Sequence, residues 1–183
     1  MTLGKSVVLV GMMGSGKTVI GHALAGYLKV THIDSDEEIV KAANMSISEI
    51  FERDGEEFFR KRETEILKRI LNGKPKIVST GGGAFVSASN RKMISSSGVS
   101  VWLKADVNLL WSRVKNNKSR PLLQKTNPFS VLQRLTEERN EFYSMANLCI
   151  VVKEEYKIID TVKILLINIL YSSSSILMFL LEI

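Results

Sequence analysis

A glycine-rich segment near the start of the chain carries the residue types needed to hold a polyphosphate. Residues 11–18 read GMMGSGKT, which fits the pattern G-x-x-x-x-G-K-[ST]. The glycines let successive backbone N–H groups point at the β- and γ-phosphates, Lys17 would bridge phosphate oxygens, and Thr18 would be a Mg²⁺ ligand. An apolar run precedes the segment and a helical pattern follows it, as this motif requires. The pattern predicts nucleotide binding and leaves kinase, GTPase and ATPase open.

The segments that would define two of these alternatives are missing from the sequence. GTPases usually read guanine with Asn-Lys-x-Asp, and residues 116–119 (NNKS) lack the aspartate. A mechanical ATPase usually has a hydrophobic strand that ends in Asp or Asp-Glu. Here the apolar run at 76–79 continues instead into Thr80 and three glycines. These absences favour a small-molecule kinase.

Two carboxylates follow the second predicted strand, residues 32–34. Asp34 and Asp36 are two apart, so on a strand they would face the same side and point into one cleft. Open α/β sheets bind ligands at the carboxyl ends of their strands. One carboxylate would hold Mg²⁺ through water, and the other would orient and deprotonate a hydroxyl. Capping of a helix by Asp36 is an equally strong alternative.

Three further features suit an anionic acceptor. Arg60 and Glu63 are three apart on a predicted helix and can pair, which would fix an arginine fork for a carboxylate, although a solvated charged face is favoured on sequence alone. Gly81–Gly83 after a strand would either bring bare N–H groups to a ligand or form a plain turn. Arg120 lies in a polar stretch, residues 115–128, that is long enough to act as a lid. It would neutralise charge on the transferring phosphoryl group, or be a surface arginine.

The elements that must position these residues alternate along the chain. The alternation predicts an α/β fold with a parallel sheet covered on both faces, in three layers α/β/α. A possible capping box at residues 46–49 predicts a helix start near Ile47, and Gly55 interrupts this helix. The predicted strands are 5–10, 32–34, 76–79, 99–103 and 148–152, and the predicted helices are 19–28, 47–71, 107–114, 131–143 and 158–169.

Size and charge limit the classes of protein. A chain of 183 residues predicts one domain. The sequence has 25 Lys and Arg against 19 Asp and Glu, and the resulting net charge of +6 favours anionic partners. The basic residues are scattered, and no aromatic-and-basic motif is present, so we expect small anions and no nucleic acid. The N-terminal residues lack the order of a signal peptide, which predicts a cytoplasmic protein.

The C-terminal part of the chain carries two further predictions. Cys149 is the only cysteine and lies in the apolar run 148–152, so we expect a buried small hydrophobe in a reducing compartment. Residues 1–171 are predicted to form the single kinase domain, and 172–183 a hydrophobic tail. The stretch 162–183 is long enough to span a bilayer, but Lys163 and the serines at 172–175 favour a packed or frayed tail and no membrane.

Taken together and in this order, six segments resemble the shikimate kinase family. They are GMMGSGKT (11–18), DSD (34–36), FRKRE (59–63), GGG (81–83), RPLL (120–123) and RNEFY (139–143), and the resemblance covers residues 7–152. It implies a nucleoside-monophosphate-kinase-like fold with a five-stranded parallel sheet and a lid. It also implies transfer of the γ-phosphoryl group of ATP to the 3-hydroxyl of shikimate, on the route to chorismate and the aromatic amino acids.

The resemblance also implies roles for particular residues. Asp36 would bind the shikimate hydroxyls and is the candidate base, and Arg60 with Arg139 would clamp the shikimate carboxylate. Thr18 would hold Mg²⁺ directly and Asp34 would hold it through water. The implied catalytic residues are Lys17, Asp36 and Arg120; the implied ATP-binding residues are Gly14, Ser15, Gly16, Lys17, Thr18, Val19, Arg113 (over the adenine) and Arg120; and the implied shikimate-binding residues are Asp36, Arg60, Gly81, Gly82, Gly83 and Arg139.

The sequence departs from the family in three places. Glu141-Phe142 stand where the family often has Pro-Leu, Val19 stands where Ser or Thr is commoner, and the tail after about residue 171 has no counterpart. The first departure changes the stiffness near Arg139 but leaves Tyr143 in register. Two alternatives stay open: another small-metabolite kinase, such as a gluconate kinase, and a nucleotide-binding module without kinase activity. We expect a monomer.

Overall fold

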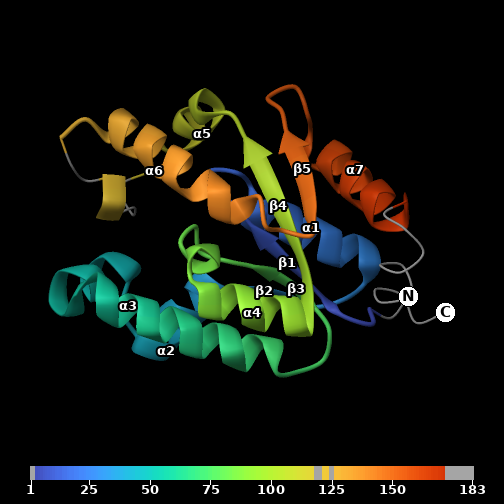
Figure 1. The fold of residues 1–183 in the computed structure, drawn as a ribbon, viewed down its shortest axis with the longest axis horizontal. Helices are drawn as coiled ribbons and strands as arrows, with labels where there is room; N and C mark the ends of the chain where they lie inside the picture. Colours follow the sequence, from blue (N-terminus) through green and yellow to red (C-terminus); the bar gives the residue numbers. More distant parts are fainter. Residues whose placement is uncertain (1–2, 118–120, 124–125, 172–183) are drawn as a thin grey trace.

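The computed structural model describes residues 3–117, 121–123 and 126–171. Within these residues five strands form one sheet, and every neighbouring pair of strands is parallel. The strand order is β2-β3-β1-β4-β5, so β1 lies at the centre, with β3 and β2 on one side of it and β4 and β5 on the other (Figure 1). The strands are β1 (Ser6–Val10), β2 (His32–Asp34), β3 (Ile77–Ser79), β4 (Gly98–Ala105) and β5 (Leu148–Val152).

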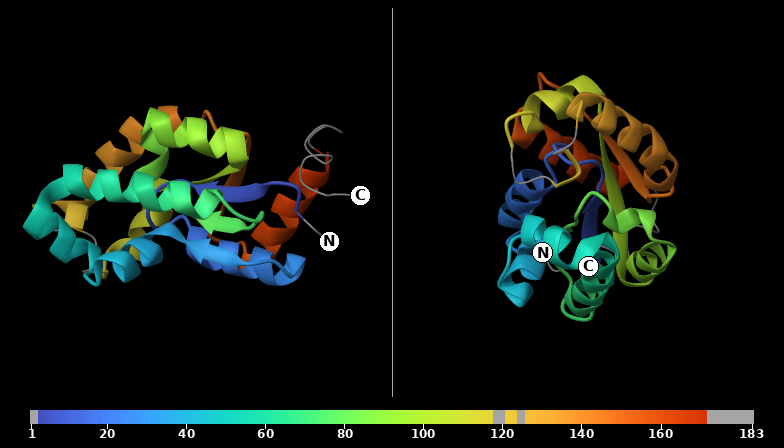
Figure 2. Two further views of the ribbon diagram at one scale, coloured as in Figure 1. Left: turned by 90° about the horizontal axis from the view of Figure 1, so that it is seen from below. Right: turned by 90° about the vertical axis from the view of Figure 1, so that its left-hand side faces the viewer.

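In the part of the chain that the structure describes, seven α-helices cover the sheet on both faces, which gives the three layers that the alternation of elements predicts. Helices α1 and α7 lie on one face, and α4 and α6 lie on the other (Figure 2). The helices are α1 (Lys17–Leu28), α2 (Ser35–Ala43), α3 (Ile47–Leu71), α4 (Ala88–Ser97), α5 (Val107–Val114), α6 (Pro128–Tyr143) and α7 (Ile158–Tyr171), with 3-10 turns η1 (Ala84–Val86) and η2 (Pro121–Leu123).

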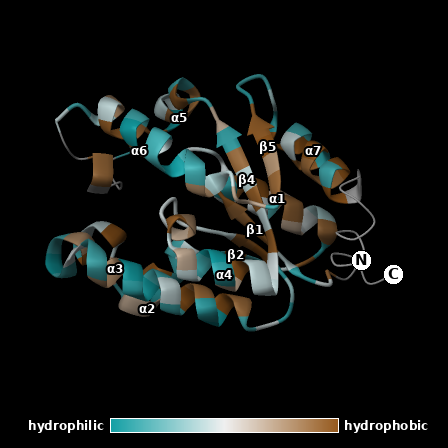
Figure 3. Ribbon diagram, viewed as in Figure 1, coloured by the Kyte–Doolittle hydropathy of each residue, from teal (hydrophilic) through white to brown (hydrophobic). Residues whose placement is uncertain are grey.

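The side chains of β1 divide the core into two clusters. Val7 and Leu9 face α1 and α7, whereas Val8 and Val10 face the cluster to which α2–α6 contribute. All four valine and leucine side chains are fully buried, as expected for a central parallel strand that is covered on both faces. In Figure 3 the central strands are hydrophobic, while much of α3 and α6 is hydrophilic. The loop that follows β1 therefore starts from the buried centre of the sheet.

Local signals in the sequence predicted several element boundaries well. Four elements match residue for residue: β2, β5, α3 and α5. The capping box at Ser46 is confirmed, because its hydroxyl accepts from Glu49 N while the Glu49 carboxylate accepts from Ser46 N. Gly55 interrupts α3 with φ +81°, as the sequence indicated. Helix α4 was not predicted, and the helix α2 entered only as the alternative in which Asp36 caps a helix; both helices are short and contain few apolar residues.

The prediction for Cys149 is wrong, because its side chain is exposed. Strand β5 is an edge strand, and its burial alternates so that Ile150 and Val152 pack into the core while Cys149 and Val151 face outward. An apolar run had suggested a strand that is buried on both faces, but at the edge of the sheet only one face is covered.

Some predictions fall outside the described residues. These are Arg120, parts of the predicted lid 115–128, and the tail 172–183. Within residues 3–117, 121–123 and 126–171, no helix is both long enough and apolar enough to pass through a bilayer.

Candidate active site

The loop after β1 has the conformation that a phosphate-binding segment requires. Gly14 and Gly16 have φ values of +83° and +94°, which L-residues with a side chain rarely adopt. Lys17 begins α1, and its ammonium donates to the carbonyl oxygens of Gly11 and Met12 at 2.8 Å each. The cation therefore lies over the loop, at the positive end of a helix dipole, where an anion is favoured.

The two aspartates after β2 both lie beside this loop, but in a different way from the one expected. Asp36 is not on the strand; it lies in the first turn of α2, and Asp34 is the residue that caps this helix by accepting from Asp36 N at 2.9 Å. The other oxygen of Asp34 accepts from the Thr18 hydroxyl at 2.7 Å. Both carboxylates line one cavity with Thr18, so the expected convergence holds although the strand argument for it does not.

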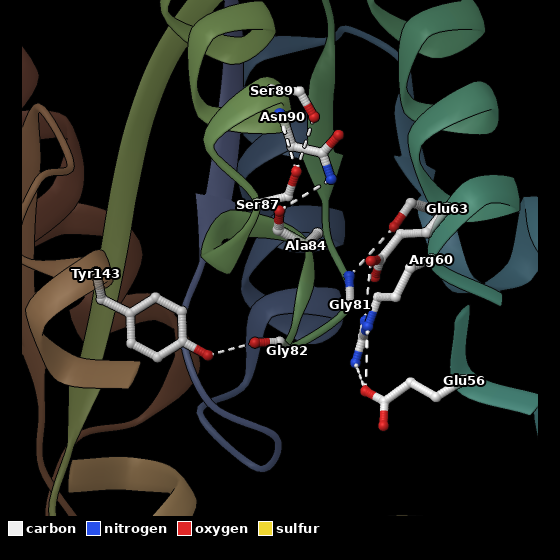
Figure 4. Close-up of polar contacts among 11 residues, drawn as sticks. Glu56, Arg60, Glu63, Gly81, Gly82, Ala84, Ser87, Ser89, Asn90 and Tyr143 are labelled. Carbon is white, nitrogen blue, oxygen red and sulfur yellow. Dashed lines mark hydrogen bonds and ion pairs between the residues drawn. The ribbon is translucent and has the colours of Figure 1, made fainter. Parts of the chain in front are cut away.

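Arg60 is held by two carboxylates of its own helix. Its guanidinium pairs with Glu63 and with Glu56, both at 2.9 Å, in the i,i+3 and i,i+4 positions (Figure 4). Glu63 is 1% exposed, whereas the Glu56 side chain is 53% exposed. The solvated face that sequence alone favoured is therefore excluded for Arg60, because its main partner is buried.

The carboxylates of Asp36 and Glu63 and the guanidinium of Arg60 pack against the triple glycine, where a side chain would leave no room for them. A Cβ at Gly81 would lie 2.6 Å from Asp36 Oδ1 and 2.8 Å from Glu63 Oε1. A Cβ at Gly83 would lie 2.3 Å from Arg60 Nη1. These contacts are shorter than van der Waals distances, so carboxylates and guanidinium pack directly against the glycine backbone.

The last turn of α6 completes the cluster. Arg139 is only 8% exposed, and its Nη1 lies 3.7 Å from the position of a Cβ on Gly82. The Tyr143 hydroxyl donates to the Gly82 carbonyl oxygen (Figure 4). Met13 N, in the phosphate loop, is 3.4 Å from the same Cβ position. Arg139, the glycines and the phosphate loop are therefore neighbours in space, although they are far apart in the sequence.

Two adjoining cavities result from this arrangement. The larger, of about 630 Å³, runs from the phosphate loop to the junction of α2 and α3. The smaller, of about 60 Å³, lies among Asp36, Arg60, Gly81–Gly83 and Arg139. Both are lined by Met13, Asp36, Ile47 and Gly82, so a hydroxyl held in the small cavity would face the loop.

Burial and charge alter the acidity of two groups in this cluster. Burial raises the pKa of the Glu63 carboxyl above its ordinary value; the pair with Arg60 opposes this rise, and the nearby Asp36 adds to it. Burial disfavours the charged form of Arg60, but its carboxylate partners Glu63 and Glu56 outweigh burial and raise its pKa. Arg60 stays cationic, as binding of a carboxylate requires.

Several residues of the site were missed or given no role by sequence reasoning. Ser35 Oγ accepts from Gly81 N at 3.2 Å, which ties the start of α2 to the glycine segment. Ser79 Oγ donates to Lys17 O at 2.8 Å and lies 2.9 Å from His32 Nε2, which joins β2 and β3 to the start of α1. No local signal could reveal these contacts, because the partners are 46 or more residues apart in sequence. Arg113, by contrast, was among the predicted ATP-binding residues. It donates to Gly14 O at 3.1 Å and so reaches the phosphate loop from α5.

A parallel α/β/α sheet with this loop after its central strand, and with a cavity of carboxylates and arginines beside it, defines a P-loop kinase of small molecules. The profile of the family described as Shikimate kinase matches residues 13–167. The chain belongs to the shikimate kinase family, and it transfers the γ-phosphoryl group of ATP to the 3-hydroxyl of shikimate. The alternative of a nucleotide-binding module without activity is thereby set aside.

Relatives and solved structures agree with this assignment. The chain is 56% identical over 156 residues to the shikimate kinase of Ruegeria pomeroyi, covering 85% of this chain and 80% of that protein. It is 55% identical over 148 residues to the enzyme of Cereibacter sphaeroides, covering 81% and 74% of the two chains. The structure of shikimate kinase from Acinetobacter baumannii in complex with shikimate superposes with a TM-score of 0.89 at 36% identity, over 93% and 95% of the chains. A gluconokinase from Sinorhizobium meliloti, at 19% identity and a TM-score of 0.55, shares the fold alone.

Proposed function

We propose that the small cavity is the shikimate site and that the loop Gly11–Thr18 holds the phosphates of ATP. The observation that carries the proposal is the convergence of Asp36, Arg60 and Arg139 on the triple glycine, directly beside the phosphate loop. Arg60 and Arg139 would clamp the shikimate carboxylate, since two guanidinium forks suit a planar anion. The backbone of Gly81–Gly83 would contact the ring from the side on which no side chain intervenes.

Asp36 would bind the 3-hydroxyl of shikimate and either align it or accept its proton. Asp36 lines both cavities, so its carboxylate can reach a hydroxyl in the small one while that hydroxyl faces the γ-phosphate. Lys17 would bridge the β- and γ-phosphate oxygens, and Arg120, outside the described residues, would add a second cation from the lid. Phosphoryl transfer depends mostly on such positioning and charge neutralisation.

The residues beside the loop fit a bound Mg²⁺. The Thr18 hydroxyl and the Asp34 carboxylate are hard oxygen ligands, and they are already in contact at 2.7 Å. Thr18 would hold the ion directly and Asp34 through water. The ion would neutralise charge on the β- and γ-phosphates. Mg²⁺ is usually held by one or two protein oxygens and the substrate phosphates, which is the set offered here.

The remaining ATP contacts that we propose come from Arg113 and from the residues in and beside the phosphate loop. Arg113 already lies against Gly14, and we propose that its guanidinium covers the adenine while Gly14, Ser15, Gly16 and Val19 surround the phosphates. Every residue assigned above belongs to one chain, so we propose a monomer. We also propose a cytoplasmic location, where ATP is available.

Arg139→Ala tests the assignment of the acid site. We expect the KM for shikimate to rise about a hundredfold, because a buried charge pair with the substrate carboxylate is lost, while the KM for ATP changes little. Initial rates with MgATP and either shikimate or gluconate, followed by ADP release, measure both values and the preference for the acceptor. Equal increases in the two KM values would contradict the clamp.

A further inference from the structure

The hydroxyl of Tyr143 lies where three segments of the site meet. The residue ends α6 and is 1% exposed, and its ring packs against Trp102 with the ring centroids 5.9 Å apart. Its hydroxyl donates to the Gly82 carbonyl oxygen (Figure 4) and lies 3.6 Å from Met12 Sδ. The Arg139 guanidinium, one helical turn earlier on α6, is close enough to the phenol to lower its pKa against the effect of burial. Burial raises the pKa of Tyr143 to about 12, so the phenol keeps its proton for donation at neutral pH.

Each of these partners belongs to a different functional part. Met12 is in the phosphate loop, Gly82 is in the glycine segment, and Arg139 is the proposed carboxylate clamp. Because a trans peptide unit is planar, fixing the Gly82 carbonyl also fixes the Gly83 N–H, which lies in the same plane and points in the opposite direction. The Tyr143 hydroxyl can therefore fix the positions of the Gly82–Gly83 peptide and of the Arg139 guanidinium relative to the phosphate loop.

The same turn of α6 also contacts the residue that holds the 3-10 turn η1, directly after the glycine segment. The Arg91 guanidinium lies 5.1 Å from the centroid of the Phe142 ring and donates to Phe85 O and Val86 O at 2.9 and 2.7 Å. Phe142 thus supports the cation that caps the 3-10 turn η1. Residues 142 and 143 together bracket the segment 81–86 at both ends, which is more than core packing of a tyrosine requires.

A buried tyrosine in a core usually needs only some partner for its hydroxyl. If packing were the whole role of Tyr143, a backbone carbonyl in any part of the core would serve, and removal of the hydroxyl would lower only the free energy of unfolding. Here all three neighbours of the hydroxyl belong to the site, and two of them belong to the acid-binding half.

We propose that Tyr143 is a positioning residue for shikimate, whose hydroxyl aligns Gly82 and Arg139 against the phosphate loop. The inference rests on the site roles proposed above. It predicts that the hydroxyl determines the affinity for the acid far more than the affinity for the nucleotide, because its strongest contacts are to the acid-binding half of the site.

Tyr143→Phe tests the inference, since the ring and its packing on Trp102 are kept. We expect the KM for shikimate to rise about tenfold, the KM for ATP to stay within about twofold, and kcat per folded enzyme to fall less than the shikimate KM rises. Tyr27→Phe, at a tyrosine that is 64% exposed on α1, is the matched control and should change neither KM. An unchanged shikimate KM, equal increases in both KM values, or a lower melting temperature as the sole effect would overturn the inference.

Two further variants separate the possible failures. If Tyr143→Phe does not fold, Phe142→Leu weakens the support of Arg91 for the 3-10 turn that follows the glycine segment and leaves the Tyr143 hydroxyl in place. It should raise the shikimate KM about threefold with the ATP KM unchanged, and no change would overturn the inference. Arg139→Ala distinguishes this inference from the proposed function. If that variant raises the shikimate KM and Tyr143→Phe does not, only the role of Tyr143 is wrong; if neither does, the site assignment is wrong.

Discussion

The two glycine-rich segments of the site use glycine for different physical reasons. In the phosphate loop, Gly14 and Gly16 have positive φ, which only a residue without a Cβ adopts readily. In the segment Gly81–Gly83 no φ is positive, and Gly83 has a φ of −96°, which any residue can adopt. Gly81 and Gly83 are required by their surroundings, since a side chain would overlap the carboxylates or the guanidinium that pack against them.

This difference explains why one motif is readable from sequence and the other is not. A loop shape that depends on backbone dihedrals is encoded within eight residues, so its pattern is specific wherever it occurs. A segment whose glycines are needed because other groups pack against them can be recognised only once α2, α3 and α6 have been placed beside it. In sequence, GGG is as consistent with a plain turn as with a ligand site.

The largest effect should come from the one cationic side chain that the phosphate loop itself supplies. Lys17→Ala should lower kcat about a thousandfold or more, because charge on the β- and γ-phosphates loses its cation in the transition state. Initial rates at saturating shikimate and MgATP measure this, and a melting curve shows whether the fold is kept. Activity near that of the unchanged enzyme would refute the role of Lys17.

A smaller effect should follow from a methyl group in the phosphate loop. In Gly16→Ala, a Cβ at φ +94° is strained by about 1–2 kcal/mol and lies 3.2 Å from Ile20 Cδ1. The loop must shift, so the KM for ATP should rise about tenfold, while the KM for shikimate changes little. Gly26→Ala on α1 is the control, because nothing lies within 4 Å of its Cβ position. It should leave both KM values unchanged and stabilise the helix by about 1 kcal/mol.

The equivalent change in the second segment should have the opposite selectivity. In Gly83→Ala the backbone is unstrained, but the methyl group displaces the Arg60 guanidinium. We expect the KM for shikimate to rise by about fivefold to tenfold through the misplaced fork, with the KM for ATP unchanged. If Gly16→Ala and Gly83→Ala affected the same substrate, the distinction between the two segments would be lost.

The smallest effect concerns the pH dependence of stability at Glu63. Because its pKa is raised in the folded state, its contribution to the free energy of unfolding is present in full below the ordinary value of 4.5 and is lost as pH rises through the raised value. Glu63→Gln has no proton to lose. The stability of the variant relative to the unchanged enzyme should therefore improve as pH rises from about 4 to about 8. Urea unfolding across that range measures the difference, and a constant difference would show that Glu63 does not titrate there.

Much of the molecule could be predicted from local patterns. The phosphate loop, the boundaries of β2, β5 and α5, the interruption of α3 at Gly55 and the pairing of Arg60 with Glu63 all depend on residues close in sequence. Together with the order of the six motifs, they were sufficient for the fold class and the family. The failures have local causes too. The sequence left a strand and a helix equally open for Asp36, because the first turn of α2 is polar. Cys149 was predicted to be buried, because a run of apolar residues does not reveal which strand lies at an edge.

The sequence by itself determined the chemistry available: a phosphate loop, an aspartate pair, and arginines suited to a carboxylate. Only the tertiary structure decided that Asp36, Arg60 and Arg139 meet at Gly81–Gly83, and that Tyr143 joins this cluster to the phosphate loop. The physical reason is that dihedral preferences and helix caps act over a few residues. Close packing joins segments that are about a hundred residues apart, and its partners are known only when the sheet and the helices on its faces have come together.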